Sequence, residues 1–297
     1  MSATSPSSKP FTDVDWDGFD EVYSNEPELR RPGRLLGAMI CDLWKGRELA
    51  WRLFVRDFSS KYRQTALGYV WAFLPAIATS LAFILLQSGG VISVGELGVP
   101  YAAYVMIGTL LWQVFADAMQ SPLATVLASK AVLVKINLPR EAILLSGLYL
   151  VAFNFLIRLV LLAAVFAWFR ILPPPQALLL PLGALSLAVF GFMIGLLLTP
   201  LGILYQDVTQ SLPILTSIWL LLTPVAYPPT SEGLLGRISS HNPVTPLLGT
   251  SRDWLLEGRA ADLGGFLWVF GIALALLFVG WVVFRIATPH LIARMGG

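Results

Sequence analysis

The hydrophobic positions of the chain divide it into a polar beginning and a series of long apolar stretches. Six stretches are apolar enough to be membrane spans, at about residues 67–88, 101–120, 142–169, 177–198, 209–227 and 264–284. Because a spanning helix needs about 20 mostly apolar residues, the pattern predicts an all-α, polytopic membrane protein with six transmembrane helices in residues 67–288. Pro75, Pro213 and Pro224 fall within these spans and predict kinks.

A helical period also marks the segment before the first span. Apolar side chains recur there at spacings of seven, four, three and four, and mostly basic side chains lie on the opposite side. The apolar residues are Trp44, Trp51, Val55, Phe58 and Tyr62. This pattern predicts an amphipathic helix over residues 42–66 that lies in the membrane interface. A helix packed on a soluble partner is the alternative.

The connection between spans five and six, residues 228–262, is neither a long polar domain nor a simple turn. Its apolar positions predict two short amphipathic helices, one around Leu234 and Ile238 and one from Val244 to Leu256. Asn242 is expected to cap the second helix, and Pro243 suits its first turn. We expect both helices to be re-entrant or interfacial, or to fold back into the bundle.

Composition and charge support a membrane location and indicate an orientation. The 297 residues are 56% hydrophobic and 13% charged, with a mean hydropathy of +0.73, which argues against a soluble enzyme. Residues 1–30 contain no apolar run, so no secretory signal is predicted. With the N-terminus inside, the inner segments hold 15 Lys and Arg and the outer loops hold four. The positive-inside rule then places both termini in the cytosol, as a largely disordered tail (1–41) and a short tail (289–297).

The sequence lacks the residues of common catalytic sites. It has no Gly-x-x-x-x-Gly-Lys-Ser/Thr phosphate loop, so the chain is not expected to hydrolyse ATP by that route. Its only histidines are His241 and His290 and its only cysteine is Cys41, which favours neither a metal site nor a disulfide. A net charge of +2 gives no sign of a nucleic-acid partner. We predict a chain with no catalytic residue, metal or cofactor of its own.

Two ionisable side chains, Asp117 and Arg158, lie inside the predicted spans. Counted from the starts of their spans, each lies about 24 Å along at 1.5 Å per residue, which places Asp117 near the cytosolic face and Arg158 in the outer leaflet. An ion pair between them is therefore not expected. Arg158 is predicted to snorkel outward or to meet Asn154, Glu96 or an anionic ligand. So few buried charges argue against a proton- or sodium-driven carrier.

Aromatic side chains suggest a path for sugars. Four rings form a stripe on the second span and a fifth lies in span five, and these candidate channel-lining residues are Tyr101, Tyr104, Trp112, Phe115 and Trp219. The alternative is that the end residues anchor the helix at the interface and that the other rings are ordinary packing residues. For any single ring, this alternative is favoured.

Several segments resemble the type-2 ABC exporter permeases that move bacterial polysaccharides. Residues 55–75 read VRDFSSKYRQTALGYVWAFLP, 135–141 read KINLPRE, 223–228 read TPVAYP, and 252–258 read RDWLLEG after Asn242-Pro243. The resemblance runs from about residue 48 to the end. Gln206 stands before Asp207 where an Arg-Asp pair is usual, and Leu138 stands where Phe is usual.

The resemblance implies a homodimer with two copies of a cytosolic ATPase subunit, which binds ATP and Mg²⁺. Members export O-antigen, capsule, teichoic-acid or related glycans across the inner membrane, often on a lipid carrier. The loops expected to couple to the ATPase contain Lys135, Asn137, Leu138, Pro139, Arg140, Glu141, Gln206 and Asp207. An incoming lipid diphosphate would meet Arg52, Arg56, Lys61, Tyr62 and Arg63, although these residues suit anchoring to anionic lipid equally well.

Two other functions remain open from the sequence. A type-2 ABC exporter of a small lipid or a drug would share the fold and the coupling loops. A membrane-embedded glycosyl- or acyltransferase would need a carboxylate or histidine that faces a cavity, and the sequence offers no convincing one.

Overall fold

A computed structural model of the chain describes residues 32–63, 73–90, 97–133, 140–229 and 233–295. The chain divides into two units, Met1–Cys41 and Asp42–Gly297. Helix α1 (Pro32–Lys45) begins in the first unit, and the predicted tail up to residue 31 lies outside the described residues. The described residues form helices and no strands, which confirms the all-α class.

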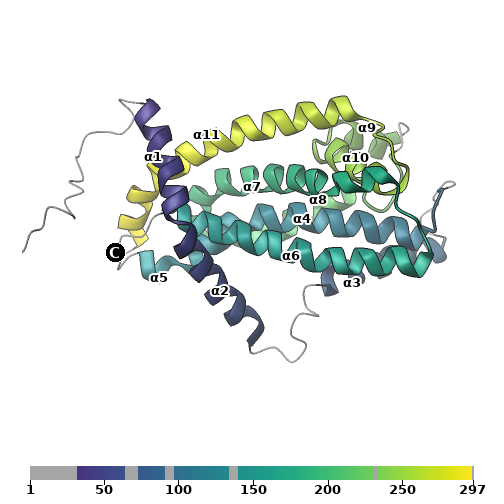
Figure 1. Ribbon diagram of the computed structural model, residues 1–297, viewed down its shortest axis with the longest axis horizontal. Helices are drawn as coiled ribbons and strands as arrows, with labels where there is room; N and C mark the ends of the chain where they lie inside the picture. The colour runs from purple at the N-terminus through teal and green to yellow at the C-terminus, as the bar shows by residue number, and fades with distance from the viewer. Residues whose placement is uncertain (1–31, 64–72, 91–96, 134–139, 230–232, 296–297) are drawn as a thin grey trace, which may run out of the picture. The chain divides into compact units, whose positions relative to one another are not determined.

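Within the part of the chain that the structure describes, four segments are long and apolar enough to cross a membrane. They are α4 (Tyr101–Ala128), α6 (Arg140–Phe169), α7 (Leu180–Leu204) with the short 3₁₀ helix η3 (Pro175–Leu179) before it, and α11 (Leu263–Met295). Helices α3 (Leu74–Ser88) and α8 (Gln206–Leu222) are shorter. Figure 1 shows the four long helices running side by side, with the short α5 (Lys130–Leu133) at one end. Four of the six predicted spans thus meet the length criterion, while residues 67–72 of the predicted first span lie outside the described residues and the six-span count stays a prediction.

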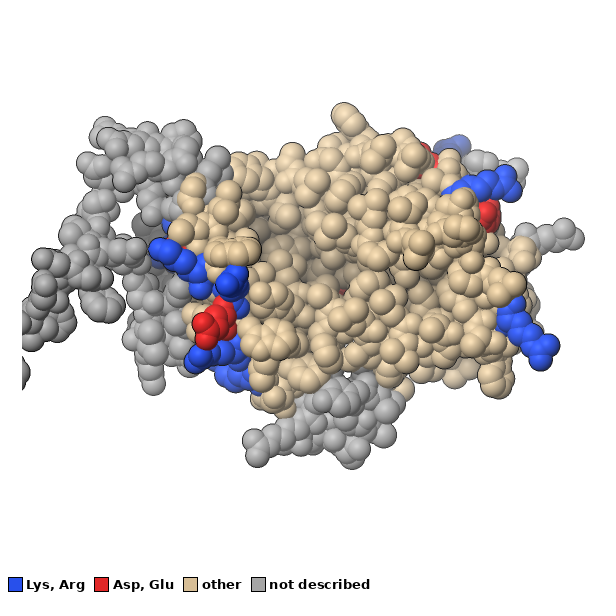
Figure 2. All heavy atoms as spheres, in the orientation of Figure 1, with Lys and Arg blue, Asp and Glu red and all other residues tan. Residues whose placement is uncertain are grey.

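Helix α4 is the central helix of the bundle. It packs against α3, α6, α7, α8 and α10, and 78% of its most apolar stretch is buried, against 22% for α6 and 17% for α11. The outward faces of α6 and α11 are apolar, with Leu156, Val160 and Trp268 all exposed. Charged side chains gather toward both ends of the face in Figure 2 and leave its middle free. Apolar outward faces between charged ends are typical of a membrane protein.

Two glycines allow α4 and α7 to approach each other closely. Gly191 and Gly195 lie one turn apart on α7, and a Cβ on either would overlap a backbone carbonyl oxygen of α4, that of Phe115 or that of Met119. Small residues at this spacing permit tight helix packing in membranes, where no hydrophobic effect drives helices together.

We therefore expect Gly195→Ala to destabilise the protein. One added methyl group must push α7 away from the Met119 carbonyl, at a cost of about 1–3 kcal/mol. Gly271→Ala is the matched control, because no heavy atom lies within 4 Å of a Cβ at that position on α11. Thermal unfolding of the two variants in the same detergent measures the difference. Equal midpoints would show that the α4–α7 contact tolerates a side chain.

The ends of several predicted spans are corrected by the structure. Helix α4 continues to Ala128, eight residues beyond the predicted end, because Ser121 and Thr125 are buried and Thr125 Oγ1 donates to the Ser121 carbonyl at 2.9 Å. Hydroxyl side chains that donate to a carbonyl of their own helix can be buried. They interrupt the apolar pattern in the sequence, but the helix continues through them. Pro75 lies in the first turn of α3, and Pro224 follows the end of α8, so neither kinks a span.

The predicted amphipathic helix is divided at Gly46 into α1 and α2 (Arg47–Arg63). A Cβ at Gly46 would lie 3.1 Å from that of Ala142, so the break lies close against α6. The buried side of α2 contacts α6 through aromatic rings, with the Phe58 and Phe153 centroids 4.5 Å apart. Trp51 remains exposed. The apolar face of α2 is thus shared between α6 and the surroundings.

The two short helices predicted in residues 228–262 are present as α9 (Gly233–His241) and α10 (Val244–Leu256). Helix α10 packs on α4, α7 and α11, and Leu247 and Leu248 are fully buried there. The second helix therefore folds back into the bundle. The N-cap of α10 is Pro243 and not Asn242, so the expected positions are shifted by one residue. Asn242 still stabilises the start of α10, because its Oδ1 accepts the backbone N–H of Val244 at 3.1 Å.

Candidate functional site

A polar cluster joins α4 and α6 in the middle of the bundle. Nη2 of Arg158 lies 2.8 Å from Oδ2 of Asp117, and Nδ2 of Asn154 donates to the same oxygen at 2.9 Å. Arg158 and Asn154 are buried, whereas the Asp117 side chain is 25% exposed. Among the described residues, Nε and Nη1 of Arg158 have no hydrogen-bond partner.

This pair corrects the expectation that Asp117 and Arg158 lie at opposite ends of the membrane. The expectation ended the second span at residue 120, but α4 continues to Ala128 and has 28 residues, close to the 30 of α6. Asp117 and Arg158 therefore both lie near the middle of their helices. Because adjacent antiparallel helices bring their middles together, the two charges meet.

The predicted channel aromatics pack mainly inside the chain. Phe115 is fully buried, and its ring centroid lies 4.9 Å from that of Trp112, 5.9 Å from that of Phe190 and 5.2 Å from that of Trp219. Tyr104 is also buried, while Tyr101 is partly exposed at the start of α4. These contacts are those of a helix core, and the channel-lining role of the rings stays a prediction.

Trp219 differs from the other predicted rings because it borders an open space. It lines a hollow of about 470 Å³ together with Arg237, His241 and Asn242. Nε1 of Trp219 donates to Oδ1 of Asn242 at 3.0 Å, and Nδ2 of Asn242 donates to Oγ1 of Thr223 at 2.8 Å. Asn242 thus joins α8, the turn after it and α10.

Arg252 is a buried charge that the sequence analysis placed in an outer loop. It is 3% exposed, its Nη1 donates to the Pro224 carbonyl at 3.0 Å, and its guanidinium lies 4.1 Å from the ring centroid of Tyr104. Burial lowers the pKa of Arg252, but an arginine remains charged at neutral pH. The residue shares the apolar side of α10 with Leu248 and Leu255 at helical spacing, a signal that could have indicated its burial.

A second charge network lies at the end of the bundle where α6 begins. Nη1 of Arg285 lies 2.7 Å from Oε1 of Glu141 and 2.9 Å from Oδ2 of Asp42, and Arg140 donates to the Arg285 carbonyl at 3.2 Å. Glu141 is 5% exposed. The predicted coupling residues Arg140 and Glu141 are thus tied to α11, a contact that the sequence did not indicate.

The other predicted coupling and lipid-binding residues are less completely placed. Gln206 and Asp207 are exposed in the first turn of α8. Arg52 and Arg56 are exposed on α2, each paired with a neighbouring carboxylate at 2.7 Å, Glu48 or Asp57. Lys135, Asn137, Leu138 and Pro139 lie outside the described residues, as do the side chains of Lys61, Tyr62 and Arg63.

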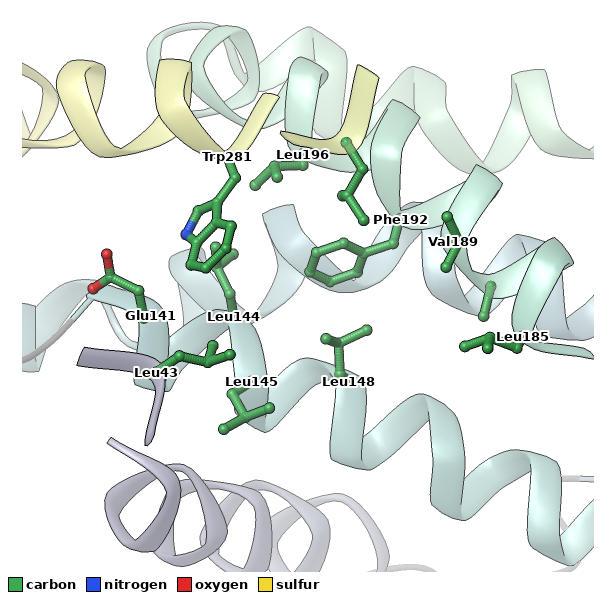
Figure 3. Close-up of a pocket in the computed structure, with 12 residues that line it drawn as sticks. Leu43, Glu141, Leu144, Leu145, Leu148, Leu185, Val189, Phe192, Leu196 and Trp281 are labelled. Carbon is green, nitrogen blue, oxygen red and sulfur yellow. The ribbon is translucent and has the colours of Figure 1, made fainter. Parts of the chain in front are cut away.

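An apolar groove of about 280 Å³ lies between α6, α7 and α11 (Figure 3). Leucines, Phe192 and Trp281 line it, and Glu141 lies at its edge. Among the side chains that form it, Glu141 is the one carboxylate, and that carboxylate is bound to Arg285. The groove offers a largely hydrocarbon surface.

These features define an α-helical integral membrane protein whose central helix carries a polar cluster. No protein-family model matches the chain. It is similar to the O-antigen export system permease protein RfbA of Myxococcus xanthus, with 21% identity over 251 residues, which are 83% of this chain and 95% of that protein. It is also similar to the protein of the same name from Klebsiella pneumoniae, with 22% identity over 209 residues, 68% of this chain and 78% of that protein. The resemblance to polysaccharide-exporting permeases is thereby confirmed.

Proposed function

We propose that the chain is the permease subunit of an ATP-driven exporter that moves a polysaccharide across the bacterial inner membrane. The observation that carries this proposal is the similarity to two O-antigen export permeases over most of the chain and most of their own lengths. The four long apolar helices fit a transport subunit.

In this proposal the transporter has six spans per chain, two copies of the chain, and cytosolic termini. Helix α8 with 17 residues reaches about 26 Å, close to the 30 Å hydrocarbon core, and α3 is preceded by residues 64–72, outside the described part. Both helices expose apolar side chains, among them Leu85 and Ile214. These faces suit lipid or a second copy.

ATP and Mg²⁺ would bind to a separate cytosolic subunit that docks at the starts of α6 and α8. Gln206 and Asp207 are exposed there and available to a partner. Glu141 is held by Arg285, so a displacement of the α6 start would be passed to α11. A rigid-body shift of packed helices is a common way to transmit such a movement.

The cargo would arrive on a lipid carrier, whose diphosphate meets α2. Arg52 forms an exposed ion pair with Glu48, and Arg56 forms one with Asp57. Exposed pairs of this kind contribute about 0–1 kcal/mol, so an arriving phosphate can replace the carboxylate at little cost.

Deletion of the gene in the source bacterium tests the function. We expect the long-chain polysaccharide to disappear from the cell surface and its lipid-linked form to accumulate inside, because synthesis continues without export. A plasmid copy of the gene should restore the surface polymer. Unchanged surface polysaccharide with an altered lipid composition would contradict the proposal and favour a small-lipid exporter.

A further inference from the structure

Helix α4 is open on one side only. From residue 102 onward, its side chains that are not buried are Ala102, Met106, Gln113, Asp117, Gln120, Ala124, Leu127 and Ala128. Nearly all follow one another at three, four or seven residues, which places them along one stripe of the helix. The contacts within the chain therefore cover every other side of α4.

The middle of this stripe is polar. Gln113, Asp117 and Gln120 are partly exposed and lie near the centre of a 28-residue helix long enough to cross a membrane. Polar side chains at that depth normally face a protein interior or a water-filled cavity, because contact with lipid is costly. The outward side of α6 at the same level is apolar, with Leu156 and Val160 on either side of Arg158. The α4 stripe thus differs in kind from a lipid-facing surface.

Two neighbouring helices contact the stripe. Asp117 binds Arg158 of α6. One turn before Gln113, α3 covers the stripe, because Thr109 is buried there with its Oγ1 2.7 Å from Oγ of Ser80. At 3.6 residues per turn, Tyr104 and Phe115 lie on the opposite side of α4 from Gln113. The rings of Tyr104 and Phe115 therefore face the interior of the bundle, whereas the amides of Gln113 and Gln120 lie on the open side of α4.

We propose that the stripe of Gln113, Asp117 and Gln120 lines the aqueous path of the glycan between two copies of the chain. This inference rests on the proposed function. Amide groups both donate and accept hydrogen bonds, as sugar hydroxyls do. Arg158 balances the charge of Asp117, so the lining suits uncharged sugars rather than cations. In a two-fold dimer, the same stripe of each copy contributes to one path.

Cysteine accessibility tests the inference. Cys41, the only cysteine, is first replaced by serine, and Gln113→Cys and Gln120→Cys are compared with Leu156→Cys and Val160→Cys. Gln113 and Gln120 flank Asp117, and Leu156 and Val160 flank Arg158. Because Asp117 and Arg158 are in contact, the two pairs of cysteines lie at a similar depth and differ mainly in the side of the bundle that they face. In membrane vesicles that contain the whole transporter, a charged methanethiosulfonate should modify the stripe cysteines at least about tenfold faster, because the reactive thiolate forms in water.

Three results are distinguishable. Faster modification that slows in vesicles from polysaccharide-producing cells, compared with cells whose polysaccharide synthesis is blocked, supports the inference. Equal rates at all four positions would overturn the aqueous stripe and leave the export function standing. If the stripe cysteines react faster but at the same rate in both kinds of vesicle, the glycan is not the occupant of the stripe. The gene-deletion result then decides separately whether the chain exports a polysaccharide.

Discussion

Replacing Asp117 by leucine is expected to destabilise the protein more than any other single change in the bundle. The variant leaves Arg158, whose side chain is 6% exposed, without its counter-ion. An uncompensated buried charge costs about 3–5 kcal/mol. Thermal unfolding in detergent should show this as a midpoint lowered by roughly 10 °C for a chain of this size.

Two further variants separate this explanation from a simple packing defect. Arg158→Met should cost less than Asp117→Leu, because the remaining carboxylate is 25% exposed and can be hydrated. The double variant should recover most of the lost stability, since no buried charge is left. Additive losses in the double variant would contradict the ion-pair explanation.

Arg252 and Tyr104 are expected to stabilise the protein as a coupled pair. The buried guanidinium lies over the Tyr104 ring and binds the Pro224 carbonyl, and thereby joins α10 to α4 and to the turn after α8. A desolvated cation–π contact contributes about 2 kcal/mol. A double-mutant cycle of Arg252→Met and Tyr104→Leu should therefore give a coupling energy of about 1–2 kcal/mol.

The neighbouring Arg259 provides the control for this cycle. It is exposed just beyond the end of α10, so Arg259→Met should change the free energy of unfolding by less than about 0.5 kcal/mol. A coupling energy near zero between Arg252 and Tyr104 would show that the arginine acts through its hydrogen bonds to the carbonyls of Pro224 and Val225 and not through the ring.

Local patterns along the chain predicted much of the fold. Long apolar runs indicated the helices that became α4, α6, α7 and α11, and helical spacing indicated α9 and α10. A contribution of Asn242 to the start of α10 also followed from the sequence to within one position, because its hydrogen bond with Val244 spans only two residues. The motifs predicted the resemblance to polysaccharide-exporting permeases, and the relatives confirm it.

The candidate site depended on contacts that no local pattern records. Glu141 and Arg285 are 144 residues apart, and no pattern of neighbouring residues pairs them. Arg252 was counted with the outer loops because it lies between the predicted spans five and six. Its spacing with Leu248 and Leu255 could have indicated burial, but only the fold supplies the ring and the carbonyl that compensate it.

The sequence by itself determined that this chain is helical, where most helices lie, and which surfaces are apolar enough for a membrane. Those properties follow from the composition and period of neighbouring residues. Only the tertiary structure decided that Asp117 meets Arg158 and that α4 turns its amides outward and its aromatic rings inward. Both outcomes depend on how long each helix is and which neighbours cover its sides, and packing between distant segments sets them.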